Sequence, residues 1–200
     1  MQRDKLLIAH IIKEYDRKFP FKTIESDFEK HYKFIASLFN LNSFDELAQK
    51  LHLLYRASEH NFDSFKFHQL CDGKGPTLVI IRSKSKRTFG GYSTVSWHST
   101  NLHSSAPGSF LFSLEKQTKH TIYQNEDKAI KGFNNYGPIF GAGSDIFISN
   151  FCNKNNTSNS NLGYTYSLPN GMSYGTSEAQ SHFDISKYFE VEEYEVFSVE

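Results

Sequence analysis

Short runs of β-forming residues, separated by turn residues, make up most of the chain after Gly73. These runs cover 77–83, 87–97, 109–115, 120–124, 144–150, 162–168 and 193–199. Many alternate with a period of two, and Phe110, Phe112 and Leu114, for example, share one strand face. Short alternating runs without long helical patterns between them predict an antiparallel β-sandwich.

Before Gly73 the apolar residues recur at helical spacing. Predicted helices run from Leu6 to the Phe19-Pro20 pair, from near Thr23 to Phe39, from Ser43 to about Ser58, and from Phe65 to Cys71. Ser43 and Glu46 have the spacing of a capping box. The sequence therefore predicts an α+β fold: a two-sheet antiparallel β-sandwich with helices packed against it. We divide it into an N-terminal helical extension, residues 1–46, and a main domain, residues 47–200.

The stretch CDGKGPTLVII, residues 71–81, looks at first like a phosphate-binding loop. A Walker loop needs Lys followed by Ser or Thr at the start of a helix, so that backbone N–H groups surround the phosphate. Here Gly75 and Pro76 follow the lysine, the proline has no N–H, and Thr77 opens a strand. We interpret this loop as a turn.

Two other glycine clusters have the same structural interpretation. Phe89-Gly90-Gly91 lies inside a β run, where paired glycines indicate a bulge or a close backbone approach. Gly141 and Gly143, followed by Asp145, lack the third glycine of a dinucleotide fingerprint and indicate a turn. The stretch 152–161 is rich in amides and without periodicity, which predicts an exposed loop.

The cysteines and histidines give little support for chemistry. Cys71 and Cys152 do not make a disulfide framework, and Asp72 would raise the pKa of the Cys71 thiol rather than lower it. His98 and His103 have no common zinc-ligand spacing, so we predict neither a metal nor a cofactor. Trp97, the only tryptophan, packs in the core or serves as an exposed anchor for a protein partner.

Charge and hydropathy limit the classes of partner. The chain has 22 basic and 22 acidic residues, so no strong field is present to attract nucleic acid. The apolar run near the N-terminus is only seven residues long, far short of the ~18 that span a bilayer. It also lacks the cleavage site of a secretory signal. We expect a cytoplasmic, intracellular protein without a transmembrane segment.

The order of these pieces resembles a TLDc domain, the module of oxidation-resistance proteins. The resemblance is carried by the segments LLYRASEHNFDSFKFHQLCDGKGPTLVIIRSKSKRTFGGYSTVSW, SFLFSL, GPIFGAGSDIFISNFCN and FEVEEYEVFSVE. It covers residues 47–200, and the Asn-rich loop is most similar to protist members. The sequence departs from the family where Ala142 interrupts a glycine triplet and where Phe197 replaces a frequent tryptophan.

The resemblance implies a β-sandwich without an agreed catalytic centre, which associates with the vacuolar-type proton ATPase and protects against oxidative damage. It implies a structural signature at Gly75, Pro76, Thr77, Phe89, Gly90, Gly91, Trp97, Gly141, Gly143 and Asp145.

Three hypotheses remain open. The first is a non-enzymatic interaction module that acts on the proton ATPase or supports oxidative-stress resistance. The second is a structural subunit of a large protist assembly, such as a microtubule complex of the ciliary axoneme. The third is an antioxidant that uses the thiol of Cys71. The sequence does not distinguish a free regulator from a permanent subunit, nor does it give the oligomeric state.

Overall fold

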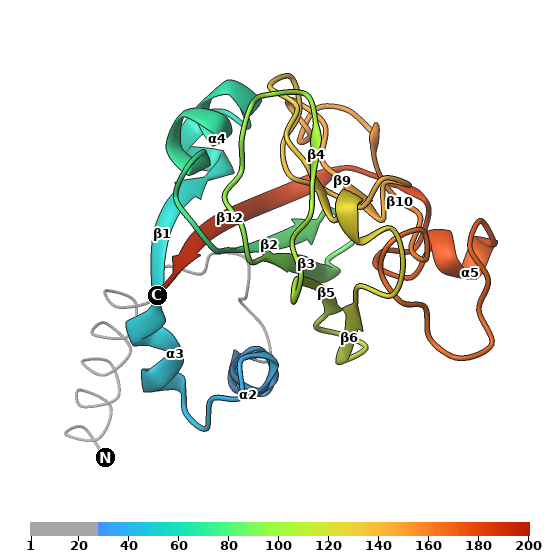
Figure 1. Cartoon of the computed structure of the whole chain (residues 1–200), viewed down its shortest axis with the longest axis horizontal. Coiled ribbons are helices and arrows are strands. Elements are labelled where there is room, and N and C mark those ends of the chain that lie inside the picture. The colour runs from blue at the N-terminus through green and yellow to red at the C-terminus, as the bar shows by residue number, and fades with distance from the viewer. Residues whose placement is uncertain (1–27) are drawn as a thin grey trace, which may run out of the picture.

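The first of two sheets contains the longest strands of the described residues. The computed structural model describes residues 28–200, and Figure 1 shows their arrangement. This six-stranded sheet has the order β1-β12-β2-β3-β5-β6, and every neighbouring pair is antiparallel. Its strands are β1 (Leu51–Arg56), β12 (Val191–Val199), β2 (Thr77–Ser83), β3 (Thr88–Ser93), β5 (Phe110–Ser113) and β6 (Thr118–Thr121).

The second sheet is built from much shorter strands. Its order is β11-β10-β9-β8-β7-β4, again antiparallel throughout. The strands are β11 (Tyr188–Phe189), β10 (Ser158–Ser160), β9 (Ile146–Phe147), β8 (Ile139–Phe140), β7 (Ile130–Lys131) and β4 (His103–Ser104). Two antiparallel sheets with short helices confirm the predicted α+β sandwich.

The helices are short and lie at the periphery of the two sheets. The described helices are α2 (Phe28–Leu38), α3 (Phe44–Lys50), α4 (Ser64–Cys71) and α5 (Ser177–Gln180), with 3-10 turns η1 (Ala57–His60) and η2 (Glu126–Lys128). The helix predicted from Leu6 lies outside the described residues, as does the predicted start near Thr23. The division between residues 46 and 47 stays a prediction.

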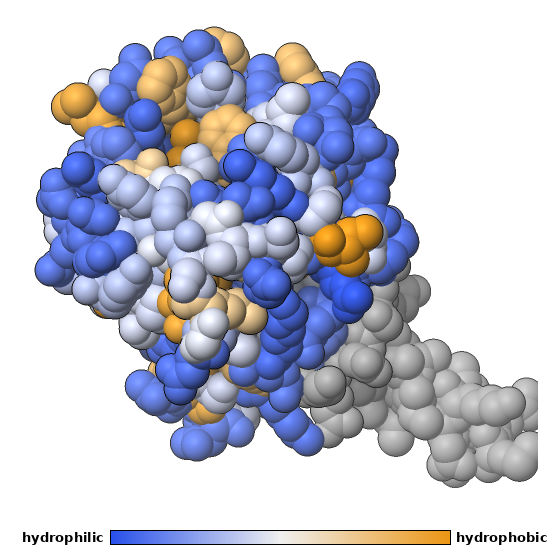
Figure 2. Space-filling model, turned by 90° about the vertical axis from the view of Figure 1, so that its right-hand side faces the viewer, coloured by the Kyte–Doolittle hydropathy of each residue, from blue (hydrophilic) through white to orange (hydrophobic). Residues whose placement is uncertain are grey.

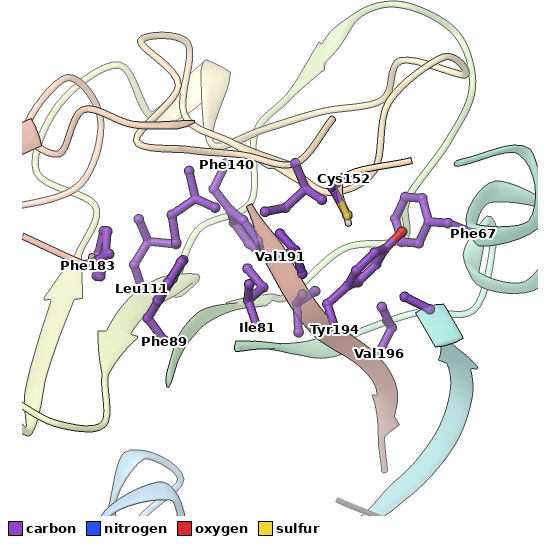
Figure 3. Close-up of a cluster of buried hydrophobic side chains, with 14 of the residues drawn as sticks. Phe67, Ile81, Phe89, Leu111, Phe140, Cys152, Phe183, Val191, Tyr194 and Val196 are labelled. Atoms are coloured by element: carbon purple, nitrogen blue, oxygen red, sulfur yellow. The ribbon is translucent and has the colours of Figure 1, made fainter. Parts of the chain in front are cut away.

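Both faces of the first sheet are buried, in two separate cores. Side chains of a strand point alternately to its two faces. Val79 and Ile81 on β2 therefore enter the core between the two sheets, which we call the inner core, whereas Leu78 and Ile80 enter the core between this sheet and α2, which we call the outer core. Figure 3 shows the inner core, where Phe67, Phe140 and Tyr194 come together from α4 and both sheets. The expected shared face of Phe110, Phe112 and Leu114 is confirmed, since all three lie in the outer core.

The capping prediction at Ser43 is confirmed with a small variation. Ser43 Oγ accepts the backbone N–H of Glu46 at 3.2 Å, and the Glu46 carboxylate accepts the N–H of Asn42 at 3.1 Å. The helix nevertheless ends at Lys50, so the predicted continuation to Ser58 is wrong. β1 follows instead and pairs with β12, and a bulge between Leu53 and Tyr55 disturbs the period of two.

Other boundaries also differ from the prediction. The stretch 152–161 is not simply an exposed loop, because Cys152 and Ser158 are buried and β10 pairs with both β9 and β11. The run 162–168 forms no strand beyond one bridge between Tyr166 and Ile122. The run 87–97 ends as a strand at Ser93, after which Trp97 makes only an isolated bridge. The predicted strand at 120–124 lies earlier, as β6.

Candidate functional site

The buried carboxylate of Asp145 organises the turn after β8. Its Oδ1 accepts the backbone N–H groups of Gly163, at 2.8 Å, and Tyr164, at 3.1 Å, and its Oδ2 accepts that of Thr165 at 3.1 Å. Burial raises the pKa of Asp145 to about 6, while these backbone hydrogen bonds act in the opposite direction. Asp145 therefore satisfies backbone donors of the segment after β10.

The glycines of this turn make room for those contacts. Gly141 has a φ of +74°, and a Cβ there would collide with the carboxylate of Asp145. Gly143 has no positive φ, but a Cβ would lie too close to the side chain of Tyr164. The two glycines therefore fit a tightly packed turn.

Gly90 and Gly91 are close-approach positions within β3. A Cβ on Gly90 would overlap the carbonyl of Val79, and one on Gly91 would lie 2.7 Å from atoms of Leu111 and Phe140. Phe89 packs in the inner core, with its ring 5.5 Å from that of Phe183. The absence of side chains at Gly90 and Gly91 lets the adjacent strand β2 and the side chains on both faces of the sheet approach β3 closely.

The Gly75-Pro76-Thr77 turn supports Trp97. The indole N–H of Trp97 donates to Thr77 Oγ1 at 2.9 Å, and Gly75 has a φ of +79°. Trp97 is 1% exposed and packs between the rings of Phe67 and Phe140. Of its two predicted roles, the structure supports core packing and not a surface anchor.

Both cysteines lie in the inner core. Cys71 and Cys152 are fully buried free thiols. Burial raises the pKa of each thiol well above its ordinary value, and the neighbouring carboxylate of Asp72 raises that of Cys71 further. The reactive thiolate is therefore disfavoured at both positions.

The closest histidine pair in the described structure is not His98 and His103, the pair considered from the sequence, but His120 and His182. His98 bonds Ser104 and Thr100 locally, and burial together with Lys131 lowers the pKa of His103. Within residues 28–200, no three His, Cys, Asp or Glu side chains come together as a metal site would require. No sequence pattern indicated the buried pair His120 and His182, whose Nε2 atoms lie 3.0 Å apart.

The sequence reasoning also missed a surface that carries tyrosines and few charges, which we call the tyrosine face: Tyr123, Tyr164, Tyr174 and the exposed residues of 170–178. Tyr123 and Tyr174 are 54% and 45% exposed, and the rings of Tyr164 and Tyr174 lie 5.4 Å apart. Between Lys154 and Asp184, Glu178 is the only Asp, Glu, Lys or Arg residue. This composition was visible in the sequence, but the position of Tyr123 beside it was not.

Figure 2 views the molecule from the side of α5, where much of the central surface is pale, neither strongly hydrophilic nor strongly hydrophobic. More than half of the residues in the segment 155–181 are Ser, Thr, Gly or Tyr, whose intermediate hydropathy matches such a pale surface.

Fold and side chains together define a β-sandwich whose glycines, tryptophan and buried carboxylate serve packing and turn geometry. The family model of the TLDc domain matches residues 23–200. The chain therefore belongs to the TLDc family, which is associated with oxidative-stress resistance and with regulation of the vacuolar-type proton ATPase. TLDc domains are generally non-catalytic.

The search of curated proteins found no match. In residues 28–200, no helix is long and apolar enough to cross a membrane.

Proposed function

We propose that this chain is a non-enzymatic protein-interaction module that binds and regulates the vacuolar-type proton ATPase, and that oxidative-stress resistance follows from this contact. Family membership supports the general class of protein binding. The residues Gly75 to Thr77, Phe89 to Gly91, Trp97 and Gly141 to Asp145 would then form the supporting scaffold. The proposed place of action is the cytoplasm.

The tyrosine face is the observation that carries this proposal. Tyrosine supplies a large and rigid contact area, while Ser, Asn and Gly supply adaptable hydrogen bonds, and antibody paratopes use the same combination. Several contacts fix the face to the sandwich: Tyr123 Oη donates to the Gly163 carbonyl at 2.7 Å, and Asp145 holds the backbone of 163–165. A partner would thus meet a surface that is already ordered.

Direct binding of the purified chain to the purified proton ATPase tests the proposal. We expect Tyr174→Ala to weaken binding by about tenfold, since exposed aromatic anchors at a contact commonly contribute more than ~1 kcal/mol. Phe65→Ala is the matched control, because Phe65 is an exposed aromatic residue on α4. Absence of binding by the wild-type chain would overturn the proposal.

The two alternatives have different consequences. A permanent subunit of a ciliary microtubule assembly would stay in the axonemal pellet through salt extraction, whereas an exchanging regulator would be released. An antioxidant that uses Cys71 needs an accessible thiolate, and the burial of that thiol and its raised pKa count against it.

A further inference from the structure

A cleft lies at one border of the tyrosine face, where the chain enters β5 and leaves β6. It has a volume of about 310 Å³ and is lined by residues 107–109 and 121–126. This is enough space for a single large side chain of a partner, and its mouth is open to solvent. Tyr123 belongs both to this lining and to the tyrosine face.

Two side-chain amides in the lining of the cleft are oriented by hydrogen bonds to the chain. The side-chain amide nitrogens of Gln124 and Asn125 donate to the Tyr164 carbonyl, at 2.8 and 2.9 Å. A carbonyl oxygen can only accept, which fixes the orientation of both amides. Each amide oxygen is thereby left as an acceptor for a ligand.

Charge and ring exposure indicate which ligand would fit. Glu126 is the one charged residue in the lining, and it is exposed. The ring of Tyr123 is held by the hydrogen bond of its hydroxyl to Gly163 and is 54% exposed. A carboxylate, two amide oxygens and an accessible aromatic ring together suit a cation that carries several N–H donors.

We propose that this cleft binds the guanidinium group of an arginine on the partner protein. A guanidinium presents five donors in a plane and stacks on aromatic rings, whereas an ammonium is a compact charge with strong hydration. The arginine would bond to Glu126 and the amide oxygens and lie against Tyr123. This inference rests on the proposed function, because it names the side chain by which the partner is recognised.

The first test uses a small probe in place of the partner. The ¹⁵N-labelled full chain is titrated with N-acetyl-arginine amide and, separately, with the citrulline analogue, which has the same shape and no charge. We expect saturable amide shifts at Tyr123, Asn125 and Glu126 with arginine, and binding weaker by about fivefold with citrulline, as for an exposed ion pair. No shifts in this region, or equal binding of both probes, would overturn the inference.

A pair of variants separates the charge in the cleft from charge nearby. Glu126→Gln removes the lining carboxylate, while Asp127→Asn removes the same charge one residue further on, outside the lining. We expect Glu126→Gln to reduce arginine binding by about fivefold and Asp127→Asn to leave it unchanged. If the two variants reduced arginine binding equally, the effect would come from the general negative charge of the region, and the proposal that arginine binds in the cleft would be contradicted.

Binding to the purified proton ATPase separates this inference from the proposed function. If wild type and Glu126→Gln bind the ATPase equally well and the arginine probe causes no amide shifts, the proposal of arginine binding in the cleft is wrong, while the proposed interaction with the ATPase is retained. If the probe binds as expected but wild type does not bind the ATPase, the arginine cleft stands and its partner is another protein.

Discussion

Gly141 and Asp145 form a unit in which each residue depends on the other. The positive φ of Gly141 turns the chain so that the Asp145 carboxylate lies where a Cβ of residue 141 would be. That carboxylate then collects backbone N–H groups of residues 163–165, which would otherwise be buried without partners. A small residue at one position and a short acid at the other thus join two distant segments.

Comparison of Gly141→Ala with Gly75→Ala separates the two constraints on Gly141. Gly75 has a similar φ, +79°, but a Cβ added there would meet nothing within 4 Å. We expect Gly75→Ala to lower the free energy of unfolding by about 1–2 kcal/mol, the conformational term alone. Gly141→Ala should cost at least ~2 kcal/mol more, because the Asp145 carboxylate must move. Urea unfolding measures both, and equal losses would contradict the proposed unit.

At the scale of elements, His120 and His182 join β6 to the chain that follows α5. His120 Nδ1 donates to the Ser167 carbonyl at 2.8 Å, so in the neutral ring its Nε2 accepts from His182 Nε2. Burial is the main cause that lowers the pKa of His120 to about 4 and that of His182 to about 3; the charge of Lys116 contributes to both values, and His120 contributes to that of His182. The pair is therefore built for two neutral rings.

The fold should lose stability in acid through this pair. In the unfolded chain both histidines bind protons near pH 6.5, whereas in the fold they do so only near pH 4 and below. Stability is therefore complete above pH 6.5 and falls as the pH drops toward 4, by about 2 kcal/mol per histidine at pH 5. His182→Gln should flatten this part of the profile, measured by urea unfolding from pH 7.5 to 4.5. Parallel profiles for wild type and variant would refute the role of the pair.

Most of the long strands were predictable from sequence, while most of the short ones were not, and the reason is physical. In β2 and β5, successive side chains enter the inner and the outer core alternately. The strands have seven and four residues, which is long enough for this pattern to be recognised in the sequence. In β1 a bulge interrupts the period of two, and Leu51 and Leu54 of this strand continue the helical spacing that begins at Leu47 in α3. β7 and β8 have two residues each and are fixed only by their neighbours, whereas the predicted run 144–150 contains β9 but forms a strand only at Ile146–Phe147.

The candidate site divides in the same way. The glycines could be assigned to backbone geometry because the residues after them excluded a phosphate loop. The cleft and the tyrosine face could not be predicted, because they join 107–109, 121–126 and 163–174, which only the fold brings together.

At the scale of the whole molecule, the sandwich encloses both thiols and leaves several aromatic side chains on the described surface. The inner core contains both thiols together with Trp97 and Tyr194. The described surface carries Tyr123, Tyr174 and other exposed aromatic residues. The proposed interaction module therefore makes a definite prediction about the cysteines.

Cys71→Ala and Cys152→Ala should behave alike. Each removes one buried sulfur, so we expect the free energy of unfolding to fall by about 1–2 kcal/mol. Binding to the proton ATPase and survival of cells in hydrogen peroxide should be kept, because neither thiol is accessible as a thiolate. The measurement is survival of cells that carry one variant as their only copy, with thermal melts of the purified chains as the control for folding.

Cys152→Ala is the matched comparison, since Cys152 lies in the same core and is not next to Asp72. If Cys71→Ala alone abolished protection, at equal stability and with binding intact, Cys71 would be the working group and the contact mechanism would be wrong.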